Sequence, residues 1–373
     1  MEAAPPPRSG LPVLGPLGPI ARTAFIATLA LSVVTIVLDF VLHFENEILL
    51  FVLSGVGILG LAWMVGLATE RLGAITGPQV GGVLNATFGN IAELIIAFFA
   101  LQAGLLQVVK ASITGSIIGN LLLVLGVSVL VGGLRNGTQV FSQRIAGSNA
   151  ALLVLAAVGL FVPAVFAFSS RDAAQGTLVE ESVIVSVLLM VGYALSLVFQ
   201  FTHPAETLGG HEPSEGHGGP AWTGRVAVLV LLLTAGLLAA LSEILVATIE
   251  TFIESFGLTP FFVGVVLIPT IGNLAEHLVA VQLAWKNKME FAMAVCYGSS
   301  LQVALFVAPV LVLLGLVVGQ PMDLVFHPLE VAAVGAAVGI SALIALDGES
   351  NWLEGALLTI IYVILAGSFF ELV

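Results

Sequence analysis

Eleven apolar stretches of about 20 residues run through this 373-residue chain, and they constrain its fold more than any other feature. A stretch of that length crosses a lipid bilayer as an α-helix. Strands of a membrane β-barrel are about half as long and alternate in polarity, whereas these stretches are continuous. Only 9% of the residues are charged, against about 25% in soluble domains. We therefore expect an all-α polytopic membrane protein with eleven transmembrane helices.

The expected spans cover residues 23–43, 47–68, 81–103, 112–133, 145–168, 178–201, 223–246, 258–285, 290–317, 325–345 and 352–371. Pro269 and Pro309 lie in the eighth and ninth spans and predict broken or tilted helices there. Short cytoplasmic loops retain Lys and Arg. If the N-terminus is cytoplasmic, all the basic residues except Lys110 and Arg171 lie inside, which predicts a cytoplasmic N-terminus and an external C-terminus.

The chain divides into two halves around a polar linker. We expect a proline-rich, disordered cytoplasmic tail at 1–22, a first transmembrane helix at 23–46, one five-helix half at 47–202 and another at 223–373. The linker at 203–222 is rich in Gly and Pro and contains three His and three Glu. It is either a cation-sensing loop or a solvated hinge, and the hinge is the simpler interpretation because most cytoplasmic loops are rich in charge.

An internal repeat relates the two halves. Residues 87–93 read TFGNIAE and residues 270–276 read TIGNLAE, an offset of 183 that also relates Gly115-Ser116 to Gly298-Ser299. Five helices separate the copies, so the copies cross the membrane in opposite senses. Two inverted five-helix repeats after one N-terminal helix are typical of secondary transporters with a site at the membrane midplane.

Two acidic residues lie deep inside apolar spans. Glu93 is near the middle of the third span and Glu276 is well inside the eighth, and neither span contains Lys or Arg to neutralise them. A charge at the bilayer centre costs at least about 2.5 kcal/mol, so intramembrane carboxylates are functional candidates by default. The net charge of −13 makes nucleic acid a poor partner and a cation the natural cargo. The single Cys, Cys296, supports no thiolate metal site.

Oxygen-bearing side chains accompany both carboxylates. Asn90 and Asn273 precede them by three residues and share a helix face with them. Gly89 and Gly272 permit a close approach or a local break, and Pro269 removes a helical hydrogen bond. Such an all-oxygen cage suits Ca²⁺. Further oxygens come either from a second layer of ligands or from residues that only bond between helices, namely Ser116, Asn120, Ser299 and Gln302.

Two further titratable residues are candidates for ion movement. His277 follows the second carboxylate and is absent from the first copy, and imidazole titrates near neutral pH, so we expect a proton carrier or pH sensor, with a packing role as the alternative. Glu243 lies in the seventh span after Ser242, where it could help cations enter or leave.

Three segments carry a family resemblance: GGVLNATFGNIAELIIAFFAL at 81–101, SITGSIIGNLLLVLG at 112–126 and IPTIGNLAEHLVAV at 268–281. They resemble the signature regions of the cation/proton exchangers, a branch of the calcium:cation antiporter superfamily, and the likeness extends over 23–371. The resemblance implies eleven helices and Ca²⁺ export driven by proton entry, with Glu93 and Glu276 binding Ca²⁺ and H⁺ alternately. It also implies His277 as the motif histidine and the plasma (inner) membrane of a prokaryote. The linker is less acidic here than in the family.

We therefore expect a Ca²⁺/H⁺ antiporter that works by alternating access in the lipid bilayer, with no cofactor beyond the transported ions. The alternatives are exchange of Na⁺ for Ca²⁺, transport of Mn²⁺ or another divalent cation, and a passive cation channel. An enzyme is not expected, because the sequence contains neither HExxH nor GxSxG. The oligomeric state stays open.

Overall fold

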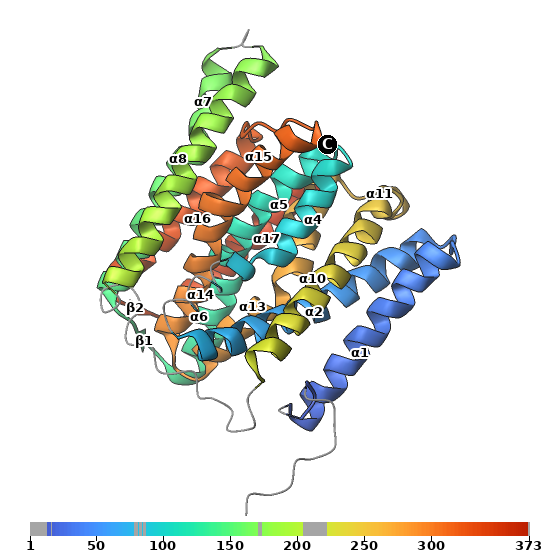
Figure 1. Cartoon of the computed structure of the whole chain (residues 1–373). Coiled ribbons are helices and arrows are strands. Elements are labelled where there is room, and N and C mark those ends of the chain that lie inside the picture. Colours follow the sequence, from blue (N-terminus) through green and yellow to red (C-terminus); the bar gives the residue numbers. More distant parts are fainter. Residues whose placement is uncertain are drawn as a thin grey trace, which may run out of the picture.

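The computed structural model is a bundle of helices that run in both directions (Figure 1). It describes residues 13–15, 17–77, 81, 84, 87–170, 174–203 and 222–371. The first half contains α1 (Pro19–Ile36), η1 (Val37–Val41), α2 (Glu47–Thr76), α4 (Ile91–Gln102), α5 (Leu106–Ile118), η2 (Gly119–Val124), α6 (Leu125–Asn136), β1 (Gln139–Val140), α7 (Gln143–Ser169) and α8 (Gln175–Thr202). The segments labelled η are π-helical turns.

The second half contains α10 (Gly224–Ala247), α11 (Ile249–Phe256), α12 (Pro260–Phe262), η3 (Val263–Leu267), α13 (Ile268–Trp285), α14 (Met289–Gln302), η4 (Val303–Val307), α15 (Ala308–Val318), α16 (Pro328–Asp347), β2 (Glu349–Ser350) and α17 (Trp352–Glu371). Ten helices among the described residues are long and apolar enough to span a membrane. The third expected span appears as the shorter apolar helix α4, and residues 81, 84, 87 and 88 before it are also helical. These helices agree with the expected eleven spans.

The N-terminal boundary differs from the expectation of a disordered tail through residue 22. Helix α1 begins at Pro19, because proline suits the first turn of a helix, where its missing N–H costs nothing. Arg22 donates from Nε to the carbonyl of Leu14 at 3.2 Å, and the Trp222 indole donates to the carbonyl of Val13 at 2.8 Å. Residues 13–15 and 17–22 are therefore ordered. Residues 1–12 and the linker at 204–221 lie outside the described residues.

The prolines of the eighth and ninth spans do not break their helices, so of the two expected outcomes, a break or a tilt, the break is wrong. Pro269 and Pro309 each follow a π-helical segment, η3 and η4, through which the helix continues. A proline has no N–H for the carbonyl four residues earlier, and one wider turn accommodates the missing bond. Segment η2, without a proline, lies at the position in the first half that corresponds to η4.

The most buried helices lie where the two halves meet. Helices α5 and α6 and helices α14 and α15 form the interior, with α4 and α13 packed against them. The long helix α2 packs along α10, its equivalent in the other half, and α1 lies on both. Helices α7 and α8 are peripheral and extend beyond the bundle at one end (Figure 1). Their exposed faces are rich in Val and Leu, as lipid contact requires.

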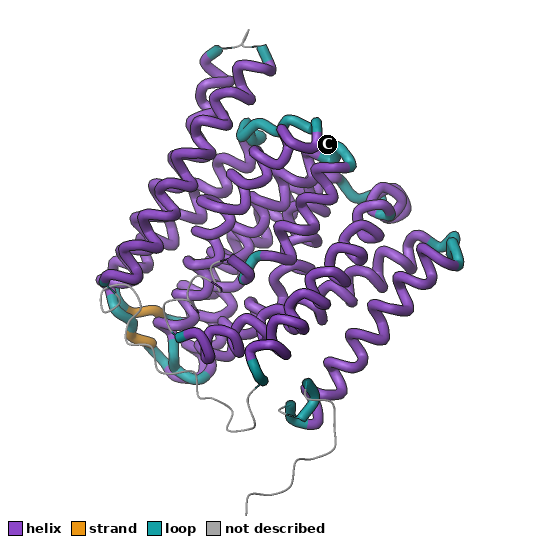
Figure 2. The backbone as a smooth tube through the Cα atoms, viewed as in Figure 1, coloured by secondary structure: helices purple, strands orange, loops and turns teal. Residues whose placement is uncertain are grey.

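A two-residue β-ribbon closes one end of the bundle (Figure 2). Strand β1 pairs antiparallel with β2, with Gln139 opposite Ser350 and Val140 opposite Glu349. The ribbon ties the connection after α6 to the connection after α16, and so joins the two halves. The sequence predicts helices only, because strands this short leave no pattern in it.

Candidate functional site

The repeated motif takes two different local forms. In the first copy, Gly89 and Asn90 form a turn, and α4 starts at Ile91, so a helix break exists there as Gly89 predicted. Glu93 then lies in the first turn of α4, where the positive end of the helix dipole favours a carboxylate. In the second copy, Gly272 lies within the unbroken helix α13. The expectation of a break is wrong there, and the expectation of a close approach is right.

Glu93 is buried between the two halves of the molecule. Its side chain is 6% exposed, and its Oε1 atom accepts hydrogen bonds from the Ser116 hydroxyl on α5 and from the Asn273 amide on α13. The Oε2 atom is buried and has no hydrogen-bond partner among the described residues. A Cβ atom at Gly272 would lie 2.8 Å from Cγ of Glu93, so only glycine lets α13 approach this carboxylate.

A second set of hydrogen bonds lies beside Glu93 and again joins the halves. The Asn90 amide donates to Oε1 of Gln302 at 2.6 Å and accepts from the Ser299 hydroxyl at 3.1 Å. The amide of Asn120, in η2, donates to Oγ of Ser299 at 3.0 Å. Asn90, Asn120 and Ser299 are all buried. These amide and hydroxyl groups therefore form one connected network around the place where α4 meets α14.

Glu276 enters the same region from the second half. It is partly buried, and it interacts with the Ser299 side chain and electrostatically with Glu93. Ser116 beside Glu93 and Ser299 beside Glu276 occupy equivalent positions of the repeat. The ring atom Nε2 of His277 is buried and has no hydrogen-bond partner among the described residues.

The structure thus brings together most of the residues that the sequence singled out. Two carboxylates meet amides and hydroxyls from both halves, contributed by Asn90, Glu93, Ser116, Asn120, Asn273, Glu276, Ser299 and Gln302. Glu243 is different, because it lies exposed on α10. Oxygen atoms of this kind are the ligands of hard cations such as Ca²⁺. Within the described residues, no three His, Cys, Asp or Glu side chains come together in a group that could hold a metal ion, so the charge of this site comes from two carboxylates alone.

Two features of the interior were missed in the sequence. Glu330 is a further buried carboxylate, 2% exposed, and its place at the start of a span made it resemble a loop residue. Gly115 is the residue at which α5 crosses η3. A Cβ atom there would lie 2.2 Å from the carbonyl oxygen of Val265. Its recurrence as Gly298 was the available signal, but the repeat alone does not say what either glycine contacts.

Comparison with known proteins agrees with this architecture. The family model described as sodium/calcium exchanger protein matches residues 46–202 and 226–370. The chain is 43% identical over 348 residues to a Ca²⁺/H⁺ antiporter of Aphanothece halophytica, a match that covers 88% of this chain and 91% of the relative. It is 41% identical over 355 residues to the Ca²⁺/H⁺ antiporter ChaA of Bacillus subtilis (strain 168), covering 93% and 99%.

Solved structures share the fold. The structure of native YfkE superposes with a TM-score of 0.80 at 39% identity and covers 93% of this chain and all of the other. The H⁺/Ca²⁺ exchanger CAX superposes with a TM-score of 0.73 at 14% identity, over 95% of this chain and 93% of that one, which shows the shared fold alone. With a family model that spans both halves and relatives above 40% identity along most of its length, this chain is a member of the sodium/calcium exchanger protein family.

Proposed function

We propose that this protein is a Ca²⁺/H⁺ antiporter that exports Ca²⁺ in exchange for protons. One observation carries the proposal: Glu93 is buried between two inverted repeats, with one oxygen held by both halves and the other unpartnered among the described residues. Similarity to relatives named as Ca²⁺/H⁺ antiporters supports the choice of ions. No enzymatic reaction and no cofactor is needed for this role.

The two carboxylates account for the coupling between the ions. Two bare negative charges side by side in a buried site cost several kcal/mol of desolvation free energy each, in order of magnitude. Glu93 and Glu276 are therefore stable either as a pair that holds one Ca²⁺ or as two protonated acids. The empty, doubly ionised state is the costly one, so the halves rarely change their orientation with nothing bound. This exclusion couples Ca²⁺ movement in one direction to proton movement in the other.

The amides complete the cage for the cation. The Asn90 and Asn273 side chains each carry an oxygen that can turn toward a cation once the carboxylates bind it. Ser116 and Ser299 each contribute a hydroxyl oxygen beside one carboxylate. His277 lies next to Glu276 in the chain with a buried ring nitrogen free of partners among the described residues, and we assign to it the passage of protons to and from Glu276.

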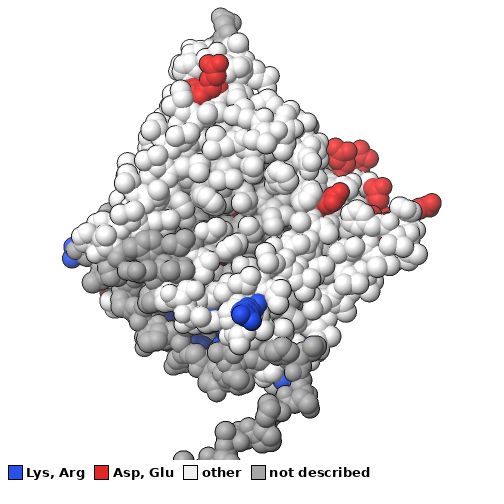
Figure 3. Space-filling view, viewed as in Figure 1, with Lys and Arg blue, Asp and Glu red and all other residues white. Residues whose placement is uncertain are grey.

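The charge distribution supports an orientation in the membrane. On the face drawn in Figure 3, acidic residues gather at the end where α11 and the connection between α1 and α2 lie, and basic residues gather at the opposite end. The exposed acids at the first end include Glu45, Glu47, Glu250 and Glu254, and the exposed basic residues elsewhere include Arg135, Arg144, Arg225 and Lys286. By the positive-inside rule the basic end is cytoplasmic. We place the N-terminus inside and the C-terminus outside, in the plasma membrane of a prokaryote.

Transport by purified protein in liposomes tests the proposal. An imposed proton gradient is expected to drive Ca²⁺ uptake, with proton movement in the opposite direction recorded by a pH-sensitive dye. Glu93→Gln and Glu276→Gln are each expected to abolish uptake, because a neutral amide lacks the negative charge that binds Ca²⁺ and cannot carry a proton. Exposed Glu254→Gln serves as the control and keeps uptake. Uptake that survives both motif substitutions contradicts the mechanism.

The same liposomes separate the alternatives. A sodium gradient that drives uptake where a proton gradient does not indicates Na⁺/Ca²⁺ exchange. Calcium movement without coupled proton flux indicates a passive channel. Competition by Mn²⁺ measures the selectivity among divalent cations, since both ions accept oxygen cages.

A further inference from the structure

A further buried carboxylate, Glu330, lies outside the cation site, at the end of the bundle where α5 and α16 begin. The Oε2 atom of Glu330 accepts from the backbone N–H of His327 at 2.8 Å, as part of the capping box that starts α16. Its Oε1 atom accepts from the Thr114 hydroxyl on α5 at 3.0 Å. Each oxygen therefore bonds a different element, and the carboxylate joins α5 to α16.

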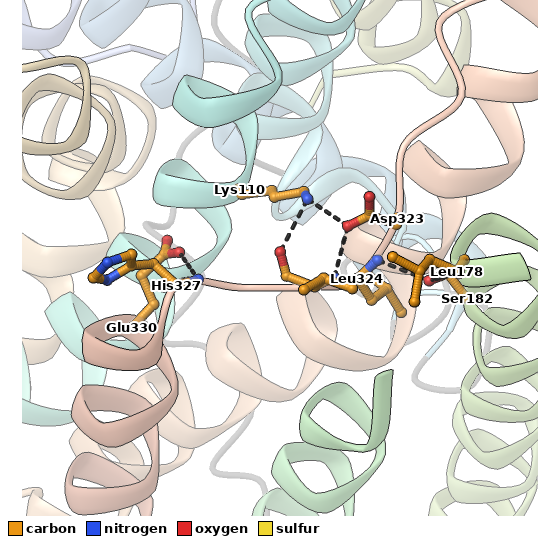
Figure 4. Close-up of polar contacts among 8 residues, drawn as sticks. Lys110, Leu178, Ser182, Asp323, Leu324, His327 and Glu330 are labelled. Carbon is orange, nitrogen blue, oxygen red and sulfur yellow. Dashed lines mark hydrogen bonds and ion pairs between the residues drawn. The ribbon is translucent and has the colours of Figure 1, made fainter. Parts of the chain in front are cut away.

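A second tether holds α5 one helical turn away. Nζ of Lys110 contacts Oδ1 of Asp323 at 2.5 Å and donates to the carbonyl of Val325 at 3.0 Å (Figure 4). Asp323 also accepts from the N–H of Val325 at 2.8 Å, so the ion pair fixes the backbone of this connection. Residues 110 and 114 share one face of α5, since they are four positions apart.

The connection that receives these bonds is itself firmly held. It joins α15 to α16 at residues 319–327, and three of its own side chains, Met322, Leu324 and Phe326, are buried. The N–H of Leu324 donates to the Ser182 hydroxyl on α8 at 2.9 Å (Figure 4). The tethers therefore fasten α5 to a rigid part of the molecule.

Helix α5 also carries Ser116, two residues beyond Thr114, which donates to Glu93 in the cation site. The helix is continuous from Leu106 to Ile118, so a shift at Thr114 moves Ser116 by the same amount. Gly115 lies between them, and there the backbone of α5 packs directly against Val265 of η3 with no side-chain bond to a neighbouring element. The placement of Ser116 then depends on contacts at the neighbouring residues, of which the bond to Glu330 is the nearest polar one.

We propose that Glu330 is a positioning residue for cation binding: by holding Thr114 it places Ser116 against Glu93. This inference rests on the proposed function, because Glu93 is taken as a cation ligand. A carboxylate suits the task because both of its oxygens accept hydrogen bonds. An amide in its place would point its NH₂ group, itself a donor, at either the His327 N–H or the Thr114 hydroxyl. Lys110 adds an attractive charge interaction with Glu330.

Thr114→Val tests the inference with little change of shape, because only the hydroxyl is lost. The apparent KM for Ca²⁺ in proton-driven uptake is expected to rise at least threefold, with a maximal rate within a factor of two of the wild type. Thr114→Ser keeps the hydroxyl and is expected to match the wild type. Glu330→Gln is expected to raise KM as Thr114→Val does.

A double-substitution cycle shows whether the effect passes through Ser116. Ser116→Ala alone is expected to raise KM, and Thr114→Val is expected to add little in the Ser116→Ala background. An unchanged KM in Thr114→Val, or effects that multiply independently in the double variant, overturns the proposal. A purely structural role would lower the melting temperature and leave KM unchanged, which also overturns it.

Calcium binding to the detergent-purified protein, measured by calorimetry, separates this inference from the proposed function. If wild-type protein shows no proton-driven uptake, the proposed function fails. Weaker Ca²⁺ binding in Thr114→Val but not in Thr114→Ser still supports the positioning role in that case, and equal binding in both overturns it.

Discussion

At the scale of single residues, the site depends on how each carboxylate oxygen is used. Glu93 has two donors on one oxygen and, among the described residues, none on the other. The donors come from helices that belong to different halves, so both hydrogen bonds can form only when the two halves have this relative position. Gly272 provides the space for the Glu93 carboxylate, because any side chain at this position would contact it.

Gly272→Ala is therefore expected to displace Glu93. The added methyl group would lie 2.8 Å from Cγ of the carboxylate, and overpacking of this kind costs about 1–3 kcal/mol. The KM for Ca²⁺ uptake is expected to rise about tenfold, which corresponds to about 1.4 kcal/mol. Gly236→Ala, where an added Cβ meets nothing, is the matched control, and equal KM values in the two variants would contradict the argument.

Asn273 and Asn120 allow a second comparison. Asn273 bonds a carboxylate, whereas Asn120 bonds a hydroxyl. Hydrogen bonds to charged groups are worth about 1.5–3 kcal/mol and neutral ones about 1 kcal/mol. In uptake assays, Asn273→Ala is expected to raise KM at least about tenfold and Asn120→Ala about fivefold. The reverse order would show that Asn120 is the more important ligand.

At the scale of elements, the central helices cross closely because glycines remove side chains at the crossing. Helix α5 meets the carbonyl of Val265 at Gly115, and η3 meets Ala111 of α5 at Gly264, where an added Cβ would lie 2.5 Å from that of Ala111. The π-helical turns before Pro269 and Pro309 keep their helices continuous while the hydrogen-bond pattern changes. Such turns often occur at functional sites.

Gly115→Ala tests the crossing. The new Cβ would clash with a backbone carbonyl, which cannot move aside as a side chain does, so we expect a drop in melting temperature together with loss of uptake. Gly119→Ala, in η2 one turn along, meets nothing within 4 Å and is expected to keep the melting temperature of the wild type. Thermal unfolding monitored by size-exclusion chromatography distinguishes the two. A stable Gly115→Ala variant would show that the helices separate at little cost.

At the scale of the whole molecule, the repeats are equivalent in sequence but not in packing. Gly115 is pressed against Val265, whereas its equivalent Gly298 has open space around it among the described residues. Gly264 packs on Ala111, whereas its equivalent Gly81 approaches Gly73 on α2. An alternating-access transporter is expected to show such asymmetry in any one conformation, because the two halves exchange their contacts between states.

The proposed orientation has a direct test in intact cells. Cysteine introduced at exposed Glu254 is expected to react with a membrane-impermeant thiol reagent, whereas cysteine at exposed Lys286 is expected to react only after the cells are opened. The native Cys296 is fully buried and contributes little background. Labelling of both positions in intact cells, or of Lys286→Cys alone, would contradict the orientation.

Most of the site could be predicted because charge is so scarce inside apolar spans. Glu93 and Glu276 stand out there, and the repeat makes them a pair, so their neighbours Asn90 and Asn273 follow from spacing alone. Lys110 is an exception to the positive-inside rule in the predicted topology. The structure gives the reason, because Lys110 forms an ion pair with Asp323. Glu330 was overlooked because a carboxylate at a helix start is ordinarily solvated, and only packing shows that this one is buried.

The spans, the inverted repeat and the two intramembrane carboxylates follow from the sequence, because the free-energy cost of placing polar groups in lipid restricts composition and spacing along the chain. Packing in three dimensions sets which oxygen of Glu93 accepts the two hydrogen bonds, how Gly272 makes room for this carboxylate, and why the prolines follow π-helical turns instead of breaks. Glu243 is exposed on α10, which its place in an apolar span does not indicate. Contacts between residues about 180 positions apart depend on how helices rotate and cross, which local patterns do not encode.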